Sequence, residues 1–138
     1  MTYGIIATDT IQSSTTGTPP QFNDGSGAQI GTLCRAWVNF NGTSATPITP
    51  RANYNVGSVT KNGTGNYTIN FTNALPDANY SANITAGGVS VGRQPVVSAS
   101  VDSSGLTVAP TTTAFRFNVV IISVANTDAD YLNVSIFR

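Results

Sequence analysis

Two carboxylates stand close together near the C-terminus, where Asp128 and Asp130 flank one alanine and follow Asn126. An oxygen-rich turn of this kind can bind Ca²⁺, and paired carboxylates also serve glycoside hydrolases. The ligand spacing of an EF-hand and its bidentate Glu are absent, however, and nothing else in the sequence indicates a groove that would raise the pKa of one carboxyl group. The sequence therefore favours an ordinary Asp-rich turn, without a metal site or a catalytic pair.

The residue types on which most acid–base and nucleophilic catalysis depends are missing. The chain has no His, and because all six acidic residues are Asp, it has no Glu. His is the commonest general base and a usual zinc ligand, and the Ser-His and Cys-His nucleophile pairs both need it. We therefore expect a protein that is not an enzyme and uses no cofactor.

Binding is the chemistry that remains. Neutral sugars are held by aromatic rings that stack on them and by amides that make directional hydrogen bonds. Loop segments 53–55, 93–94 and 126–131 carry such side chains. The predicted receptor-binding residues are Tyr54, Asn55, Arg93, Gln94, Asp128, Asp130 and Tyr131. For each of them, a plain solvated loop is the alternative.

The chain is unusually poor in charge. Charged residues make up 9% of it and the formal net charge is zero, whereas about 25% is usual in soluble proteins. Nucleic acid and anionic membranes attract basic patches, so neither is an expected partner. No stretch approaches the ~20 apolar residues of a membrane span, so no membrane insertion is expected. A neutral surface guards poorly against association, which favours membership of an assembly.

Strands must position these residues, because no segment carries a helical period. Apolar residues alternate with polar ones over 34–40, 67–71 and 80–84, and Gly, Asn or Pro bounds each run. Further strands are expected over 52–60, 96–101, 106–109, 114–124 and 131–137. The Gly-containing runs 61–66 and 102–105 predict turns. A length of 138 residues suits a single core.

Two strands indicate contacts between subunits. Trp37, the only Trp, shares the more polar face of its strand with Arg35. The later run 119–122 is apolar on both faces, which is typical of a strand covered on both sides. The predicted interface residues are therefore Trp37, Arg35, Val120 and Ile122. The alternatives are a half-covered packing role for Trp37 and a loop of the same chain over the apolar strand.

A family resemblance joins these patterns. The run 33–42, an alternating strand that opens onto an Asn-Gly turn, and the run 58–80 resemble the C-terminal domain of bacteriophage tail-fibre and virion-fibre proteins, including those of marine cyanophages. The resemblance extends from about Gly31 to the C-terminus. It implies an all-β fold, a small antiparallel, jelly-roll-like β-sandwich head that forms a homotrimer, and adhesion to a host-surface glycan.

Residues 1–30 lie outside the resemblance and are expected to dock the protein on the virion, with 31–138 as the head. Residues 3–11 are apolar and β-prone, and 12–29 read as an extended connector rich in Ser, Thr, Gly and Pro. The predicted docking residues are Tyr3, Ile5, Ile6 and Ile11. A strand that folds back onto its own domain is the alternative.

Two functions stay open on the sequence alone. The chain is either a tail fibre or fibre tip that binds the host, or a capsid decoration or head-fibre protein. A free carbohydrate-binding module fits less well, because the surface is poor in charge and His and Glu are absent. The N-terminus lacks the features of a secretory signal, so we expect synthesis in the host cytoplasm and assembly into the virion.

Overall fold

The computed structural model describes residues 8, 10–14, 20–89, 94–121 and 125–138. Throughout these residues the chain forms strands, turns and loops, which confirms the predicted all-β class. No helix in this part of the chain is long and apolar enough to cross a membrane. The chain divides into two compact units, Met1–Leu33 and Cys34–Arg138.

The smaller unit contains one short hairpin. β1 (Phe22–Asn23) pairs antiparallel with β2 (Gln29–Gly31). The turn between them is organised by Asp24, whose carboxylate accepts hydrogen bonds from the backbone N–H groups of Ser26 and Ala28. None of the described residues of this unit is buried. Ile11 is 62% exposed, and the predicted docking residues Tyr3, Ile5 and Ile6 lie outside the described residues.

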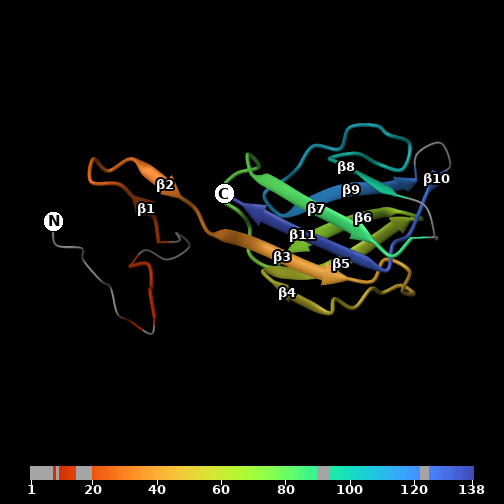
Figure 1. Ribbon diagram of the computed structural model, residues 1–138, viewed down its shortest axis with the longest axis horizontal. Coiled ribbons are helices and arrows are strands. Elements are labelled where there is room, and N and C mark those ends of the chain that lie inside the picture. Colours follow the sequence, from red (N-terminus) through yellow and green to blue (C-terminus); the bar gives the residue numbers. More distant parts are fainter. Residues whose placement is uncertain (1–7, 9, 15–19, 90–93, 122–124) are drawn as a thin grey trace. The chain divides into compact units, whose positions relative to one another are not determined.

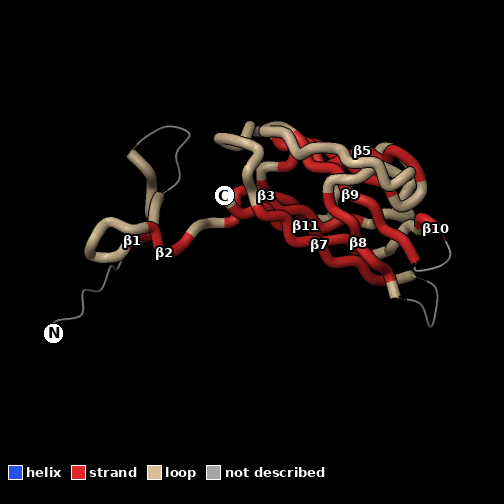
Figure 2. The backbone as a smooth tube through the Cα atoms, turned by 90° about the horizontal axis from the view of Figure 1, so that it is seen from above, coloured by secondary structure: helices blue, strands red, loops and turns tan. Residues whose placement is uncertain are grey.

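The larger unit, which we call the head, is a sandwich of two antiparallel sheets (Figure 1 and Figure 2). One sheet has the order β4 (Ala52–Tyr54), β3 (Cys34–Phe40), β11 (Tyr131–Phe137) and β7 (Ser81–Gly87). The other contains β5 (Val56–Gly63), β6 (Asn66–Phe71) and β9 (Ala114–Ile121), with β8 (Pro95–Ala99) and the short β10 (Ala125–Asn126) also pairing with β9. The predicted antiparallel sandwich is therefore confirmed.

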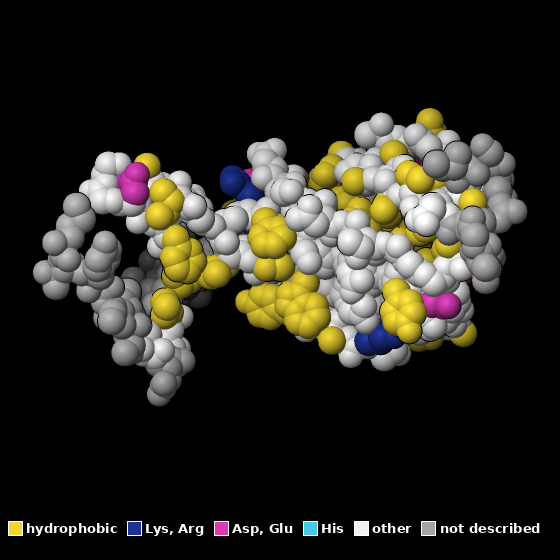
Figure 3. All heavy atoms as spheres, in the orientation of Figure 1, with side chains coloured by type: hydrophobic (Ala, Val, Ile, Leu, Met, Phe, Trp, Pro, Cys, Tyr) yellow, Lys and Arg dark blue, Asp and Glu magenta, His cyan; other side chains and the backbone are white. Residues whose placement is uncertain are grey.

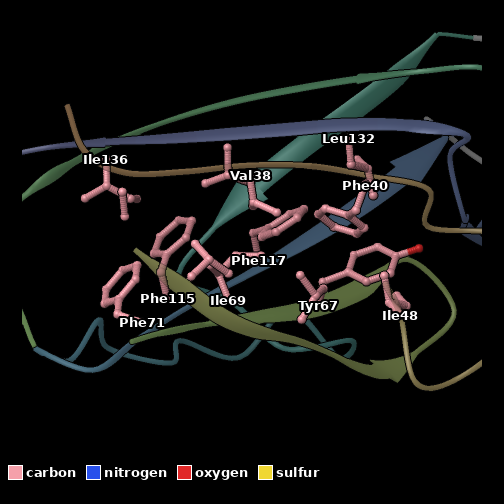
Figure 4. Packing of buried hydrophobic residues seen from close by; sticks show 14 of the residues in the cluster. Val38, Phe40, Ile48, Tyr67, Ile69, Phe71, Phe115, Phe117, Leu132 and Ile136 are labelled. Carbon is pink, nitrogen blue, oxygen red and sulfur yellow. The ribbon is translucent and has the colours of Figure 1, made fainter. Parts of the chain in front are cut away.

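The core lies between the sheets because alternate residues of the central strands are apolar. Tyr67 packs the edge of its ring against Phe40 of the facing sheet, with the ring centroids 5.3 Å apart (Figure 4). The inward-facing residues of the four central strands are Ala36, Val38 and Phe40; Leu132, Val134 and Ile136; Tyr67, Ile69 and Phe71; and Phe115, Phe117 and Val119. A register slip of one residue would turn the apolar residues of a strand toward solvent. The alternating pattern therefore determines which side chains face outward.

One predicted strand is two strands. The run 52–60 is interrupted at Asn55, whose φ of 53° lies in the left-handed region that Asn tolerates. The Asn55 amide donates hydrogen bonds to the carbonyl oxygens of Arg35 and Asn73, and its oxygen accepts one from the Asn73 N–H. The turn therefore separates β4 from β5 and sends them to different sheets.

A second expected strand, over 106–109, does not form. Thr107 makes only an isolated bridge to Val101. Between them, Asp102 accepts hydrogen bonds from the N–H groups of Ser104 and Leu106, and Gly105 has a φ of 78°. The predicted turn at 102–105 is thus present, but without a pair of strands to join.

The head has two distinct ends. β3 begins at Cys34, where the chain enters from the smaller unit, and β11 runs back beside it so that Phe137 pairs with Cys34. At the other end, β3 finishes at Phe40 beside the start of β11 at Tyr131. We call this second end the distal end. Six residue steps along β3 separate the two ends by about 20 Å.

Candidate functional site

The side chains of the β4-β3-β11-β7 sheet that point away from the core form what we call the outer face. Its middle is polar: Asn39 Nδ2 donates to Asn133 Oδ1 over 2.5 Å, and Asn133 Nδ2 donates to Thr85 Oγ1 over 3.1 Å. These hydrogen bonds cross β3, β11 and β7. Cross-strand pairs of this kind stabilise a sheet and keep the amides in fixed positions.

Aromatic side chains lie on the outer face of β3 and β4. Trp37 and Tyr54 are directly paired across these strands, and they are 38% and 58% exposed. Figure 3 shows hydrophobic side chains gathered over this part of the sheet. Arg35, half-buried, is two residues before Trp37 on the same face. The structure therefore joins two predicted interface residues to Tyr54, a predicted receptor-binding residue, in one surface that we call the Trp37 patch.

A third aromatic ring stands at the distal end. Tyr131 is 57% exposed, and the guanidinium carbon of Arg51 lies 4.6 Å from the centre of its ring. Arg51 is held by two more contacts, in which Nη1 donates to the Phe40 carbonyl (3.2 Å) and Nη2 to the Asp130 carbonyl (2.8 Å). A cation over an aromatic face is attractive. The contacts therefore hold an exposed ring in a defined place.

Asp130 places a carboxylate beside this ring. Its Oδ1 accepts a hydrogen bond from Thr43 Oγ1 (3.1 Å), and its backbone N–H donates to the Gly88 carbonyl (3.3 Å). No described residue donates a hydrogen bond to Oδ2. Asp130 is half-buried, so this oxygen can accept a hydrogen bond from a ligand. We call Tyr131, Arg51, Asp130 and Thr43 the distal cluster.

Asp128, also a predicted receptor-binding residue, uses its carboxylate inside the head. Oδ2 pairs with Lys61 Nζ at 2.6 Å, and Oδ1 accepts hydrogen bonds from the Gly65 N–H (2.8 Å) and the Tyr67 hydroxyl (2.5 Å). Burial alone would raise the pKa of Asp128, but these hydrogen bonds together outweigh burial and hold its pKa below the usual value. Asp128 therefore anchors the segment that leads into the distal cluster.

The remaining predicted site residues are dispersed. The Asn55 amide is engaged in the turn between β4 and β5, and Gln94 is exposed directly before β8 in the other sheet. Val120 is half-buried on the outer side of that sheet, paired with Val96 and Asn126. Arg93 and Ile122 lie outside the described residues. Among the residues that are described, no group of three or more His, Cys, Asp or Glu side chains could hold a metal ion.

The sequence predicted Asp130 and Tyr131 as binding residues but gave no indication of Arg51 and Thr43. Arg51 is 80 residues before Tyr131 in the chain, and no spacing pattern connects the two. The Asn41–Gly42 turn after β3 was the one local signal near Thr43, whose N–H donates to Asn41 Oδ1 and whose single hydroxyl proton is shared between Asn41 Oδ1 and Asp130 Oδ1.

Comparisons with known proteins identify no family. No protein-family model matches the chain, and no curated protein matches it. A crystal structure of the phiAB6 tailspike, in complex with three-repeated oligosaccharides of Acinetobacter baumannii surface polysaccharide, is similar at 16% sequence identity and a TM-score of 0.49. The similarity covers 95% of this chain and 30% of the tailspike chain. At this level the likeness assigns no function, which has to be inferred from the chain's own residues.

Proposed function

We propose that this protein is a bacteriophage virion protein, a tail fibre or fibre tip that attaches to the host by binding a surface glycan with the distal end of its head. The sequence resemblance to tail-fibre heads supports the virion role. The observation that carries glycan binding is the distal cluster: an exposed Tyr131 ring, held by Arg51 and set beside the Asp130 carboxylate. Rings and carboxylates in fixed positions suit sugars, which offer apolar ring faces and hydroxyl groups.

The position of the cluster also fits attachment. The chain enters the head at Cys34, and the distal cluster stands at the other end of β3 and β11. If the chain before Cys34 leads to the virion, the cluster stands at the end of the head opposite this attachment point. We propose that the protein binds without cleaving its ligand and needs no cofactor.

Binding to host cells tests this proposal. One head should bind weakly, so heads are clustered on beads to supply avidity. Tyr131→Ala should reduce cell binding by about tenfold or more without changing the melting temperature, because the ring is largely exposed. Leu106→Ala removes a side chain of similar exposure (67%) from the loop between β8 and β9, and this variant should bind as the wild type does. Failure of clustered wild-type heads to bind host cells would favour the capsid-decoration alternative.

We further propose that the head forms a homotrimer through the Trp37 patch, with Val120 as a second contact. The support is the exposure of the Trp37–Tyr54 pair on a protein with few charges to oppose association. Native mass spectrometry should give three chains for the wild type and smaller species for Trp37→Ser. A stable wild-type monomer at micromolar concentration contradicts the trimer but leaves glycan binding open.

We propose that residues 1–11 dock on other virion proteins. The support is that Ile11 is exposed and that the smaller unit buries none of its described residues, so it offers little core of its own. Deletion of residues 2–11 should leave a folded head that is not incorporated into phage particles. Loss of folding would instead mean that this stretch is an integral part of the domain.

A further inference from the structure

Two glycines border the distal cluster on the β7 side. Gly87 is the β7 partner of Tyr131, and a Cβ added there would meet nothing within 4 Å. At Gly88, with a φ of 73°, an added Cβ would lie 3.1 Å from Tyr131 Cδ2 and 3.2 Å from Asp130 Oδ2. Bare backbone therefore runs beside both the ring and the carboxylate oxygen that receives no hydrogen bond from the described residues.

The space beside Tyr131 is thus asymmetric. Arg51, which leads into β4, covers the ring from the β3 and β4 side, whereas Gly87 on β7 contributes no side chain. Side chains of a strand stand roughly perpendicular to the sheet, so any residue other than glycine at this position would project beside the ring. A ligand can occupy the volume that this side chain would fill.

We propose that the space above Gly87 is a subsite for one neutral pyranose ring of the host glycan. The apolar C–H face of the sugar packs against Tyr131, and a hydroxyl group donates a hydrogen bond to Asp130 Oδ2. This inference rests on the proposed glycan-binding function and adds the position and class of the sugar. A hydrogen bond to a charged acceptor is stronger than a neutral one, so it gives the subsite directional selectivity.

The charges of the distal cluster favour a neutral sugar over a charged one. The Asp130 carboxylate lies against Gly88, the residue after Gly87, and the guanidinium of Arg51 is already committed to the Tyr131 ring and to two backbone carbonyls. A uronic acid in this position would bring a second carboxylate close to Asp130, and like charges repel. The subsite therefore favours a neutral sugar with free hydroxyl groups.

Filling the space is the direct test. Gly87→Val places a side chain above Gly87 at a strand position with no left-handed φ, where the added Cβ meets nothing within 4 Å. We expect an unchanged melting temperature and oligomeric state, with binding of clustered heads to host cells reduced about tenfold or more. Gly63→Val makes the same change at the end of β5, where the space is equally open, and should bind as the wild type does.

The outcomes separate the subsite from the function. If Gly87→Val binds like the wild type while Tyr131→Ala does not, the subsite is wrong and the proposed function stands. If clustered wild-type heads bind no host cells, the function itself fails.

Competition with methyl glycosides tests the sugar class. Neutral methyl hexopyranosides at high millimolar concentration should displace wild-type heads from cells, and methyl glucuronide and methyl galacturonide should not. With Asp130→Asn heads, the neutral sugars should displace less well, and the difference in displacement between neutral sugars and uronides should become smaller. Displacement by uronides at lower concentrations than by any neutral sugar, or no displacement by a neutral sugar, would overturn the assignment.

Discussion

Tyr67 connects the core to the distal end of the head, because its hydroxyl group donates a hydrogen bond to Asp128 Oδ1 over 2.5 Å. The ring of Tyr67 is fully buried between the sheets, whereas Asp128 lies in the segment that leads into β11. Lys61 completes the contact on the other carboxylate oxygen. A single carboxylate thus joins the β5–β6 hairpin to the residues that precede Tyr131.

Asp128→Asn should destabilise the head by about 2 kcal/mol. The substitution removes the negative charge that pairs with Lys61, whose side chain is only 16% exposed and whose Nζ keeps, among the described residues, only its hydrogen bond to the Gly42 carbonyl oxygen. Urea unfolding measures the difference. Asp77→Asn breaks an ion pair to Arg138, which is exposed, so this control should unfold close to the wild type. Equal effects of the two substitutions would contradict the anchoring role of Asp128.

The stability of the head should fall in acid. Because its pKa is lower in the folded protein than the usual value, Asp128 stabilises the fold above about pH 4, and this contribution is lost as the pH falls through the folded-state pKa. Thermal melting at a series of pH values measures this loss. The melting temperature of Asp128→Asn should fall less in acid than that of the wild type, since the variant has no carboxylate at this position to protonate. An equally steep fall in the melting temperature of both proteins would argue against Asp128 as the source of the acid sensitivity.

Gly42→Ala should destabilise the head strongly, by about 2 kcal/mol or more. A Cβ at this position would lie 2.4 Å from the Tyr67 hydroxyl oxygen, 2.8 Å from Leu132 Cδ1 and 2.9 Å from the Ala129 carbonyl oxygen. Overpacking a well-filled core costs about 1–3 kcal/mol. Gly63→Ala, in open space, is the control and should change the free energy of unfolding little. A Gly42→Ala variant as stable as this control would show that the contact can relax.

Two substitutions at Asn55 should separate its backbone and side-chain roles. Asn55→Gly removes the hydrogen bonds to Arg35 and Asn73 but keeps the left-handed φ of 53° accessible. Asn55→Ala removes the same bonds but keeps a Cβ in that region, at a cost of about 1–2 kcal/mol that glycine does not have. Chemical unfolding should therefore find the alanine variant less stable than the glycine variant by about that amount. Equal stabilities would mean that the turn has moved away from this φ.

Binding of clustered heads to host cells should depend little on salt. The distal cluster offers one carboxylate and one guanidinium, so long-range attraction contributes little to recognition of a neutral sugar. Raising the salt concentration from about 0.05 M to 0.5 M spans most of the range in which surface charges become screened. Single heads should bind much more weakly than clustered ones at either concentration. A strong fall in binding with salt would point to a charged receptor instead.

Alternation predicted most of the fold. Over 34–40 and 131–137 the apolar residues repeat at every second position, and β3 and β11 have these bounds in the structure. Alternation did not predict the break in the run 52–60. There Asn55 turns the chain in the middle of a β-prone run, because its amide donates hydrogen bonds to Arg35 and Asn73. Such partners lie about 20 residues away, so no local pattern reveals them.

The candidate site was predictable by residue type but not by geometry. Tyr131 and Asp130 stood out as an exposed aromatic residue and an oxygen donor in one loop. Nothing in the sequence shows that Asp128, two residues earlier, points toward Lys61, which is 67 positions away. The neighbouring carboxylates therefore differ in role because one reaches a buried phenol and the other does not.

The pairing of Cys34 with Phe137 has a mechanical consequence. If the distal end grips a cell while the particle pulls on the chain at Cys34, tension runs lengthwise along β3 and β11. The hydrogen bonds between these antiparallel strands lie perpendicular to that direction. They are then loaded in shear and share the force, so rupture requires many of them to break together. In the proposed attachment role, the head would therefore withstand more force than one whose strands separate one hydrogen bond at a time.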